Sequence, residues 1–495
     1  MILSSDNISN ALSNIWQMLQ YDPKTPMLFS SGLFWLLFIF FLPIYALLKK
    51  SRTKMVVFVV AFSLYFYYKS SGLFFLMLIA TSLLDWCISW RVYSARTHGA
   101  RLAWMWTSVV ISLSILGYFK YANFFLWNWN QMVEGNFQPL DIILPVGISF
   151  YTFQSISYVV DVYRRRITPT RRWLDYLFFL SFFPALVAGP IVRADYFLPQ
   201  LKKNREASSD EIYGGLWLLI IGIVKKAVIA DYIAQYNDLI FNDPMLYTGV
   251  QTLMGVLGYT MQIYCDFSGY SDMAIGLALI MGFKLGVNFN SPYKSRNLTE
   301  FWRRWHISLS SWLRDYVYIP LGGNRKGTVR TYVNNFLTML IGGLWHGAMW
   351  KFVFWGAMHG LGLAVHKASK PLLDKIPDNF FTTLFFGLIT FIYVSLLWVF
   401  FRAADFHESV LIINNIFVDF DIRQLPEFCI VRREWCVMML VLIVAHFLPE
   451  TWAVNMERCF LRSNWAVKML VFLIVVQLVI QYMSEEVAPF IYFQF

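Results

Sequence analysis

Several stretches of this chain are apolar over the length of a membrane-spanning helix, and they constrain the fold more than any other feature. Each contains at most one charged side chain, and they cover residues 27–48, 55–67, 72–90 and 466–483. A helix of about 20 apolar residues crosses the hydrocarbon core of a bilayer. Because a helix satisfies its own backbone hydrogen bonds, it needs no water there. We therefore expect an all-α, multi-pass integral membrane protein, in agreement with a composition of 58% hydrophobic and only 14% charged residues.

The positive charge of the chain indicates its orientation in the membrane rather than nucleic-acid binding. The net charge is +11, but the basic residues lie in short links between apolar stretches, such as residues 49–54, 91–101 and 164–172. Short links rich in Lys and Arg mark the cytoplasmic side. We expect no nucleic-acid partner, and we place both termini outside the cytoplasm, with residues 484–495 as an extracytoplasmic tail. An even number of crossings, roughly 10 to 12, would connect them.

The middle of the chain, residues 144–366, does not resemble a series of simple spans. Proline interrupts its apolar stretches at Pro145, Pro184, Pro190 and Pro199. Non-helical backbone at membrane depth is tolerated only where it is buried in protein or lines a wet cavity. We predict a single integral membrane domain in which residues 144–366 form a core with a pocket or tunnel. N-terminal spans in residues 1–143 and C-terminal spans in residues 367–483 would flank this core.

Two carboxylates lie inside an apolar part of the core, in the segment 264–272. Asp266 and Asp272 are six residues apart there, with apolar runs on both sides. Charged groups at such depth are costly, so both are candidates for a functional role. The alternative is that each pairs with a nearby Lys or Arg, or caps a half-helix, and takes no part in chemistry.

A second polar segment, residues 297–320, has the pattern of an amphipathic helix. Asn297 and Glu300 resemble a capping box, and Pro320 marks the end. Trp302, Trp305, Leu309, Trp312, Leu313 and Tyr316 would share one face, flanked by Arg303, Arg304 and Arg314. We predict that this helix lies at the cytoplasmic boundary or re-enters the membrane there. Its basic residues would hold either a phosphate-rich donor such as coenzyme A or anionic lipid headgroups.

His346 is the strongest candidate for chemistry. It lies in an apolar stretch, residues 336–356, next to glycines that permit close approach of helices or of a ligand. Burial should keep its imidazole neutral, as a general base must be. His306 lies at the edge of the aromatic face, where a lone histidine is more often a packed core residue than a catalyst. His346 and His359 would not face one metal ion on a straight helix, and we expect no metal site.

These polar segments resemble motifs of the membrane-bound O-acyltransferase family. The resemblance rests on residues 265–272, 301–306, 313–316 and 344–347, with further agreement at residues 144–150 and 320–325. Within the family, the chain is similar to the bacterial branch of alginate and peptidoglycan O-acetylation and teichoic-acid D-alanylation proteins. The resemblance implies a helical fold around a tunnel, with acetyl-CoA or a similar thioester as the donor and no bound cofactor.

The resemblance also assigns roles to residues. The essential histidine of the family maps onto His346, and its second polar position maps onto His306. The candidate substrate-binding residues in these motifs and in the basic helix are Asp266, Ser268, Asp272, Trp305, Arg303, Arg304, Arg314 and Trp345.

The tail resembles an aromatic carboxy-terminal motif of the same branch, in residues 489–495. The resemblance implies that its single hydroxyl side chain, Tyr492, carries the acyl group before passing it to an extracytoplasmic partner. The alternative is an aromatic anchor at the membrane interface.

These features together predict a multi-pass O-acyltransferase of the cell (inner) membrane, surrounded by membrane lipid. It would move an acyl group, most simply acetyl, from a cytoplasmic thioester to hydroxyls of an extracytoplasmic polysaccharide, with a hydrolase-like partner protein outside. Two other functions fit the sequence: O-acylation of a lipid or a protein, and, in a different class, transport or flipping of a solute.

Overall fold

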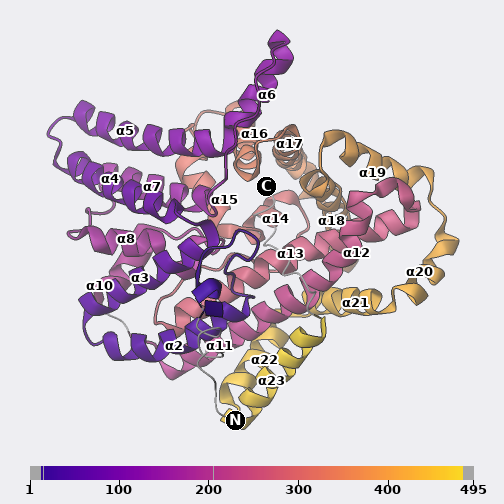
Figure 1. The fold of residues 1–495 in the computed structure, drawn as a ribbon. Helices are drawn as coiled ribbons and strands as arrows, with labels where there is room; N and C mark the ends of the chain where they lie inside the picture. Colours follow the sequence, from indigo (N-terminus) through magenta and orange to yellow (C-terminus); the bar gives the residue numbers. More distant parts are fainter. Residues whose placement is uncertain (1–12, 15, 204–205, 483–495) are drawn as a thin grey trace. The chain divides into compact units, whose positions relative to one another are not determined.

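The computed structural model describes residues 13–14, 16–203 and 206–482, and the regular secondary structure of that part of the chain is entirely helical, with no β-strand there (Figure 1). This confirms the all-α prediction. The chain forms two compact units. The first comprises the described residues within Met1–Ala122 and Leu140–Arg205, and the second those within Asn123–Pro139 and Glu206–Phe495. The boundary at residue 205 falls inside the stretch 144–366 that we expected to form a single core.

The first unit is built around aromatic and hydroxyl side chains from neighbouring helices. Phe183 packs against Phe41, with ring centroids 5.6 Å apart. Asp85 of α4 accepts hydrogen bonds from Ser108 of α5, at 2.6 Å, and from Ser155 of α7. The helices of this unit are α2 (Gly32–Leu48), α3 (Arg52–Ser71), α4 (Phe74–Ser94), α5 (His98–Leu116), the π-helical turn η1 (Gly117–Tyr121), α7 (Ile148–Tyr163), α8 (Trp173–Ser181), α9 (Phe183–Leu186) and α10 (Ala194–Lys203).

The second unit is organised by one long helix, α13 (Gly249–Ile280), which packs against helices from both sides of it in sequence. Glycines allow α11 to lie directly on α13: a Cβ atom on Gly215 would be 2.7 Å from the carbonyl oxygen of Gly276. The other helices of the second unit, as far as η5, are α6 (Ala122–Val133), α11 (Ser209–Ile223), η2 (Val224–Ala230), α12 (Asp231–Asn242), η3 (Pro244–Leu246), η4 (Pro292–Lys294), α14 (Leu298–Arg304), α15 (Ile307–Leu313) and η5 (Arg314–Tyr318).

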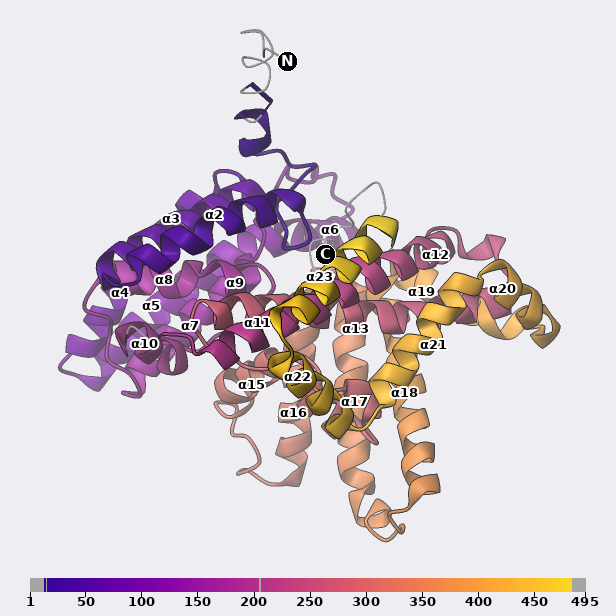
Figure 2. The same ribbon diagram turned by 90° about the horizontal axis from the view of Figure 1, so that it is seen from below.

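The remainder of the second unit begins with three long helices, and Figure 2 shows α16, α17 and α18 following one another as neighbours. The helices from α16 onward are α16 (Thr328–His346), α17 (Trp350–Leu373), α18 (Phe380–Arg402), α19 (Phe406–Val418), η6 (Ile422–Gln424), α20 (Leu425–Val431), α21 (Arg433–Phe447), α22 (Glu450–Arg462) and α23 (Trp465–Tyr482).

By length and composition, five helical stretches of the described residues are able to cross a membrane, or six if the bent pair α21 and α22 is counted as one span. The five are Phe74–Ser94, His98–Val133, Ser209–Asn242, Phe380–Arg402 and Trp465–Tyr482. This is fewer than the 10 to 12 crossings expected from the sequence. Some apolar helices, such as the 17-residue α2, are too short to be counted, whereas α13 and α17 are long enough but are not among the apolar candidates.

Candidate functional site

His346 is the last residue of α16, and close packing of α16 on α17 fixes its position. The two helices touch through glycines. A Cβ atom on Gly343 would be 2.3 Å from the carbonyl oxygen of Phe352, and one on Gly356 would be 2.5 Å from that of Met339. The chain leaves α16 at Gly347 in an extended conformation and starts α17 at Trp350.

Aromatic rings enclose the His346 side chain. Its ring centroid lies 4.9 Å from that of Trp345, 5.0 Å from that of Trp355 and 5.2 Å from that of Phe401. The residue is 3% exposed. Each of these rings meets the imidazole edge to face, an arrangement that stabilises a neutral ring without supplying a charge. So little of His346 is exposed that a substrate molecule would contact the ring only if neighbouring side chains moved.

His306 lies at a break in the segment that we expected to form one amphipathic helix. That expectation is wrong for residues 297–320: α14 ends at Arg304, α15 begins at Ile307, and η5 follows it. Trp305 is extended, and His306 is left-handed, with φ 42° and ψ 55°. A left-handed conformation is uncommon for a residue with a Cβ atom, and such residues gather at functional sites.

The break buries the His306 ring between the other two motifs. The residue is 0% exposed, and its ring centroid lies 4.6 Å from Phe267 of α13 and 5.9 Å from Trp345 of α16. Trp345 therefore contacts both His306 and His346. The structure thus brings together the segments 265–272, 301–306 and 344–347, which are far apart in sequence.

A third imidazole, that of His359 in α17, lies close to these rings, although no sequence motif predicts a role for it. Its Nδ1 accepts a hydrogen bond from the Trp302 indole at 3.3 Å, so the proton of its neutral ring is on Nε2. The ring lies 4.5 Å from that of Trp355, which also contacts His346. The signal in the sequence was the spacing of Trp355 and His359, four residues apart and hence on one helix face. We call His306, His346, His359, Trp345 and Trp355 the imidazole–aromatic cluster.

The two candidate carboxylates lie in a different environment, because each is paired with a lysine. Asp272 is 2.7 Å from Lys225. Lys226 pairs with Asp266 and also, at 2.8 Å, with Asp231. Both lysines lie in the π-helical turn η2, which faces α13. The geometry therefore corresponds to the alternative in which the carboxylates pair with nearby cations. We call Lys225, Lys226, Asp231, Asp266 and Asp272 the lysine–carboxylate cluster.

The remaining predicted site residues are placed as follows. Trp305 is a buried core residue whose ring lies 4.8 Å from that of Trp398, and Ser268 is buried on α13. Tyr492 lies outside the described residues. In the part of the chain that the structure describes, no group of three or more His, Cys, Asp or Glu side chains is arranged to hold a metal ion.

Residues 294–330, which we call the basic segment, carry less unpaired charge than their composition suggests. Arg304 pairs with Glu300 at 2.9 Å, and Arg314 pairs with Asp315 at 2.8 Å. Arg296 donates a hydrogen bond to Asp378 at 2.7 Å, and this bond holds the pKa of that carboxyl group below its usual value. Arg303 is exposed. A donor phosphate would therefore meet Arg303 more directly than Arg304 or Arg314.

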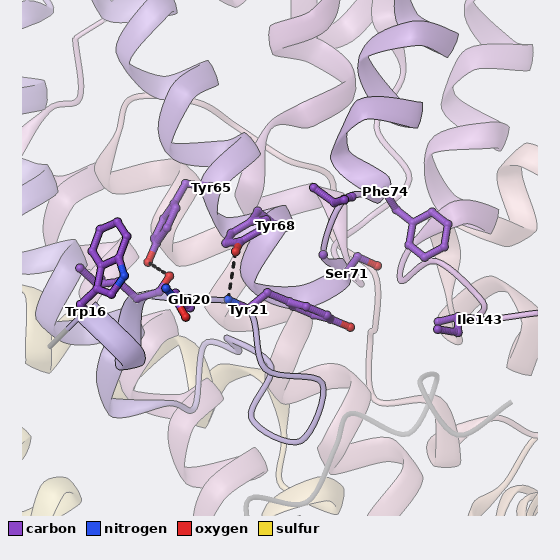
Figure 3. A pocket seen from close by; sticks show the side chains of 11 residues that line it. Trp16, Gln20, Tyr21, Tyr65, Tyr68, Ser71, Phe74 and Ile143 are labelled. Atoms are coloured by element: carbon purple, nitrogen blue, oxygen red, sulfur yellow. Dashed lines mark hydrogen bonds between the residues drawn. The ribbon is translucent and has the colours of Figure 1, made fainter. Parts of the chain in front are cut away.

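A pocket of about 820 Å³ lies in the first unit, whereas His346 belongs to the second. Figure 3 shows that tyrosines and other aromatic side chains line it. Tyr65 donates a hydrogen bond to the carbonyl oxygen of Leu19 at 3.1 Å, and the backbone N–H of Tyr21 donates one to the Tyr68 hydroxyl at 3.2 Å. These bonds occupy the polar ends of two lining tyrosines. A tunnel beside His346 stays a prediction.

Comparisons with known proteins match most of the chain. The family model described as MBOAT, membrane-bound O-acyltransferase family, matches residues 60–404, a range that holds all three imidazoles of the cluster. A probable alginate O-acetylase of Pseudomonas putida is 43% identical over 81% of this chain and 82% of that protein. A peptidoglycan O-acetyltransferase of Helicobacter pylori is 38% identical, over 72% of each chain. A teichoic acid D-alanyltransferase of Bacillus subtilis is 30% identical over 57% of this chain and 75% of that protein.

Proposed function

Because the chain belongs to the membrane-bound O-acyltransferase family, we propose that it transfers an acetyl group from a cytoplasmic thioester to hydroxyls of an extracytoplasmic polysaccharide. Two similar proteins are named for the O-acetylation of alginate and of peptidoglycan, which supports both the acetyl group and a polysaccharide acceptor. The single observation that carries the proposal is the meeting of His306 and His346 on one tryptophan ring, deep within a membrane protein.

In the proposed reaction, His346 acts as the general base. Its neutral imidazole takes the proton of the hydroxyl that attacks the thioester carbonyl, which in the proposed route is the phenol of Tyr492. The tetrahedral intermediate then expels the thiolate, which takes the proton back from the imidazolium, so the ring ends neutral. General-base catalysis of this kind accelerates a reaction by about 10²–10⁴-fold. The enclosing rings of Trp345, Trp355 and Phe401 support this role, because they hold the imidazole in a fixed orientation.

We assign His306 to the developing oxyanion. An imidazole N–H aimed at the carbonyl oxygen stabilises the negative charge that forms there, and such a donor acts most strongly where water is excluded. His306 is fully buried and fixed in its backbone conformation. A donor that is already fixed in place does not have to reorganise during the reaction.

The donor would approach from the side of the basic segment. Arg303 and the exposed residues Arg325, Lys326 and Arg330 are suited to the phosphates of coenzyme A. Because short basic links mark the cytoplasmic side, this assignment agrees with a cytoplasmic donor and with both termini outside.

Tyr492 would connect the two sides of the membrane. The acetyl group passes first to its phenolic oxygen with release of the thiol. An acceptor hydroxyl then attacks the acetyl-tyrosine ester, and its proton goes to the departing phenolate, so that the tyrosine is regenerated. A hydrolase-like partner protein would complete this second step on the polysaccharide. The family match ends at residue 404, so the carrier role rests on the aromatic motif of the tail alone.

Transport is less well supported by the arrangement of charges. A solute carrier would need carboxylates such as Asp266 and Asp272 to bind its cargo, and both are paired with lysines. An acyltransferase needs no unpaired carboxylate at membrane depth.

The proposal is tested by giving acetyl-CoA labelled in the acetyl group to membranes that contain this chain, and by mapping the label. We expect label on an ester of the polysaccharide and, when the acceptor is withheld, on Tyr492. Tyr492→Phe keeps the ring but removes the hydroxyl, so it should abolish both signals. Label on lipid or on another protein would contradict the polysaccharide acceptor. Unchanged labelling of the polymer in Tyr492→Phe would contradict the carrier.

A further inference from the structure

Asn288 has a role that no sequence motif predicted. It lies between α13 and η4 and is 1% exposed. Its Oδ1 accepts hydrogen bonds from the backbone N–H of Ser308, at 3.2 Å, and from the Ser308 hydroxyl, at 2.9 Å. Its Nδ2 donates to the hydroxyl of Ser271 on α13, at 3.2 Å. Both ends of one buried amide are therefore engaged, in two different helices.

The backbone of the same segment holds both sides of the break at His306. The N–H of Ile307 donates to the carbonyl oxygen of Asn288 at 2.9 Å. The N–H of Asn290 donates to the carbonyl oxygen of Arg304, also at 2.9 Å. His306 is thus bracketed by bonds to residues 288–290, and these bonds replace the helical bonds that a continuous helix would have made there.

These bonds account for the left-handed backbone of His306. A residue with a Cβ atom adopts φ 42° only where its surroundings over-determine the conformation. The same amide also fixes α13 through Ser271, four residues after Phe267, whose ring contacts His306. One side chain therefore sets both the imidazole and the ring against which it packs.

We propose that Asn288 is the positioning residue for His306 in acyl transfer: it holds the chain break that aims this imidazole between Phe267 and Trp345. The inference rests on the proposed function, since it assumes that His306 contributes to the reaction. It extends that function by naming a residue that would act through His306 without touching the substrate.

The first test compares single and double variants at matched amounts of membrane-inserted protein. Asn288→Ala should lower kcat by about 10²-fold, as expected for a displaced catalytic group, and leave KM for acetyl-CoA unchanged. In a His306→Ala background, it should have almost no further effect, because residues that act as a unit are not additive. Asn334→Ala is the matched control. Asn334 is also a fully buried amide, and it donates to the carbonyl oxygen of Gly323 at 2.8 Å, so its effect should multiply with that of His306→Ala.

The second test needs no activity. Glycine adopts a positive φ without steric cost, so His306→Gly should remove the strain that Asn288 opposes. Asn288→Ala should then lower the midpoint of thermal unfolding in detergent clearly more in the His306→Gly background than in the wild-type chain, because only the wild-type chain offsets part of the lost bonds by relaxing a strained backbone. Asn334→Ala should lower the midpoint equally in both backgrounds.

Several results would overturn the inference: unchanged kcat in Asn288→Ala, multiplication of its effect with that of His306→Ala, or equal thermal shifts in the two backgrounds. If Asn288→Ala fails to accumulate, Ser308→Ala removes only the hydroxyl bond to Oδ1 and is held to the same two criteria. A wild-type chain without acyl transfer refutes the proposed function. In that case, the thermal comparison still decides whether Asn288 holds the break.

Discussion

The two buried polar clusters of the second unit satisfy their polar groups in different ways. In the lysine–carboxylate cluster, charges neutralise one another: Lys226 meets Asp231 and Asp266, and Lys225 meets Asp272. In the imidazole–aromatic cluster, by contrast, the imidazoles pack against the rings of Trp345 and Trp355.

This difference shows that the free energy needed to bury a polar group does not tell whether the group takes part in chemistry. Burial of a charge is expensive enough that it requires a partner, and the partner then occupies the group. A neutral imidazole costs less to bury, and it can still accept and donate a proton. High cost at membrane depth therefore marks Asp266 and Asp272 in the sequence as candidates, but it does not distinguish groups that hold helices together from groups suited to chemistry.

The largest expected effect breaks the lysine–carboxylate cluster. Lys226→Met removes the cation between two buried carboxylates and should cost about 3–5 kcal/mol of stability, enough to prevent accumulation of folded protein. The measurement is the yield of monodisperse protein in detergent and its midpoint of thermal unfolding. Lys284→Met is the control, because Lys284 pairs with Glu211 at a site where the lysine is half exposed, and its loss should cost about 0–1 kcal/mol. Equal yields of the two variants would contradict the structural role.

A smaller effect tests whether packing of α16 on α17 positions the imidazole–aromatic cluster. Gly356→Ala places a Cβ atom 2.5 Å from the carbonyl oxygen of Met339 and should destabilise the fold by about 1–3 kcal/mol. The rate of acyl transfer per folded molecule should also fall, by about 10²-fold, because His346 at the end of α16 is displaced. Gly387→Ala in α18 meets no atom within 4 Å and should change neither property. Normal transfer in Gly356→Ala would show that helix contact does not set the site.

The smallest effect distinguishes pairing from substrate binding at Asp272. The double change Lys225→Met with Asp272→Leu replaces an ion pair by apolar side chains of similar size, which is often neutral or stabilising. We expect transfer within about threefold of wild type if the pair is structural, since removing both partners leaves no unpaired charge. Kinetics of acetyl transfer at varied donor concentration measures this. A large rise in KM for the donor would instead show that Asp272 takes part in substrate binding.

The sequence predicted most of what depends on local pattern. Apolar runs predict the helical membrane fold, and sequence motifs mark the segments that carry His306 and His346, although not their contact through Trp345. Contacts between distant segments were not predictable in this way. The pairing of Lys225 with Asp272 spans 47 residues, and the break at His306 depends on Asn288 in a loop with no periodicity. Amphipathic spacing over residues 297–320 suggested one helix because tertiary hydrogen bonds, which override helix propensity there, leave no mark on the pattern.

The proposed reaction depends most on the imidazole of His346, and a single-turnover measurement tests the role of this side chain directly. Inserted His346→Ala protein is mixed with labelled acetyl-CoA and acceptor, beside wild type and His407→Ala, whose imidazole is exposed on α19. We predict that His346→Ala folds normally and transfers acetyl about 10²–10⁴-fold more slowly than wild type, while His407→Ala transfers at the wild-type rate. Transfer by His346→Ala at the wild-type rate would contradict the account, because no base would then be needed at this position.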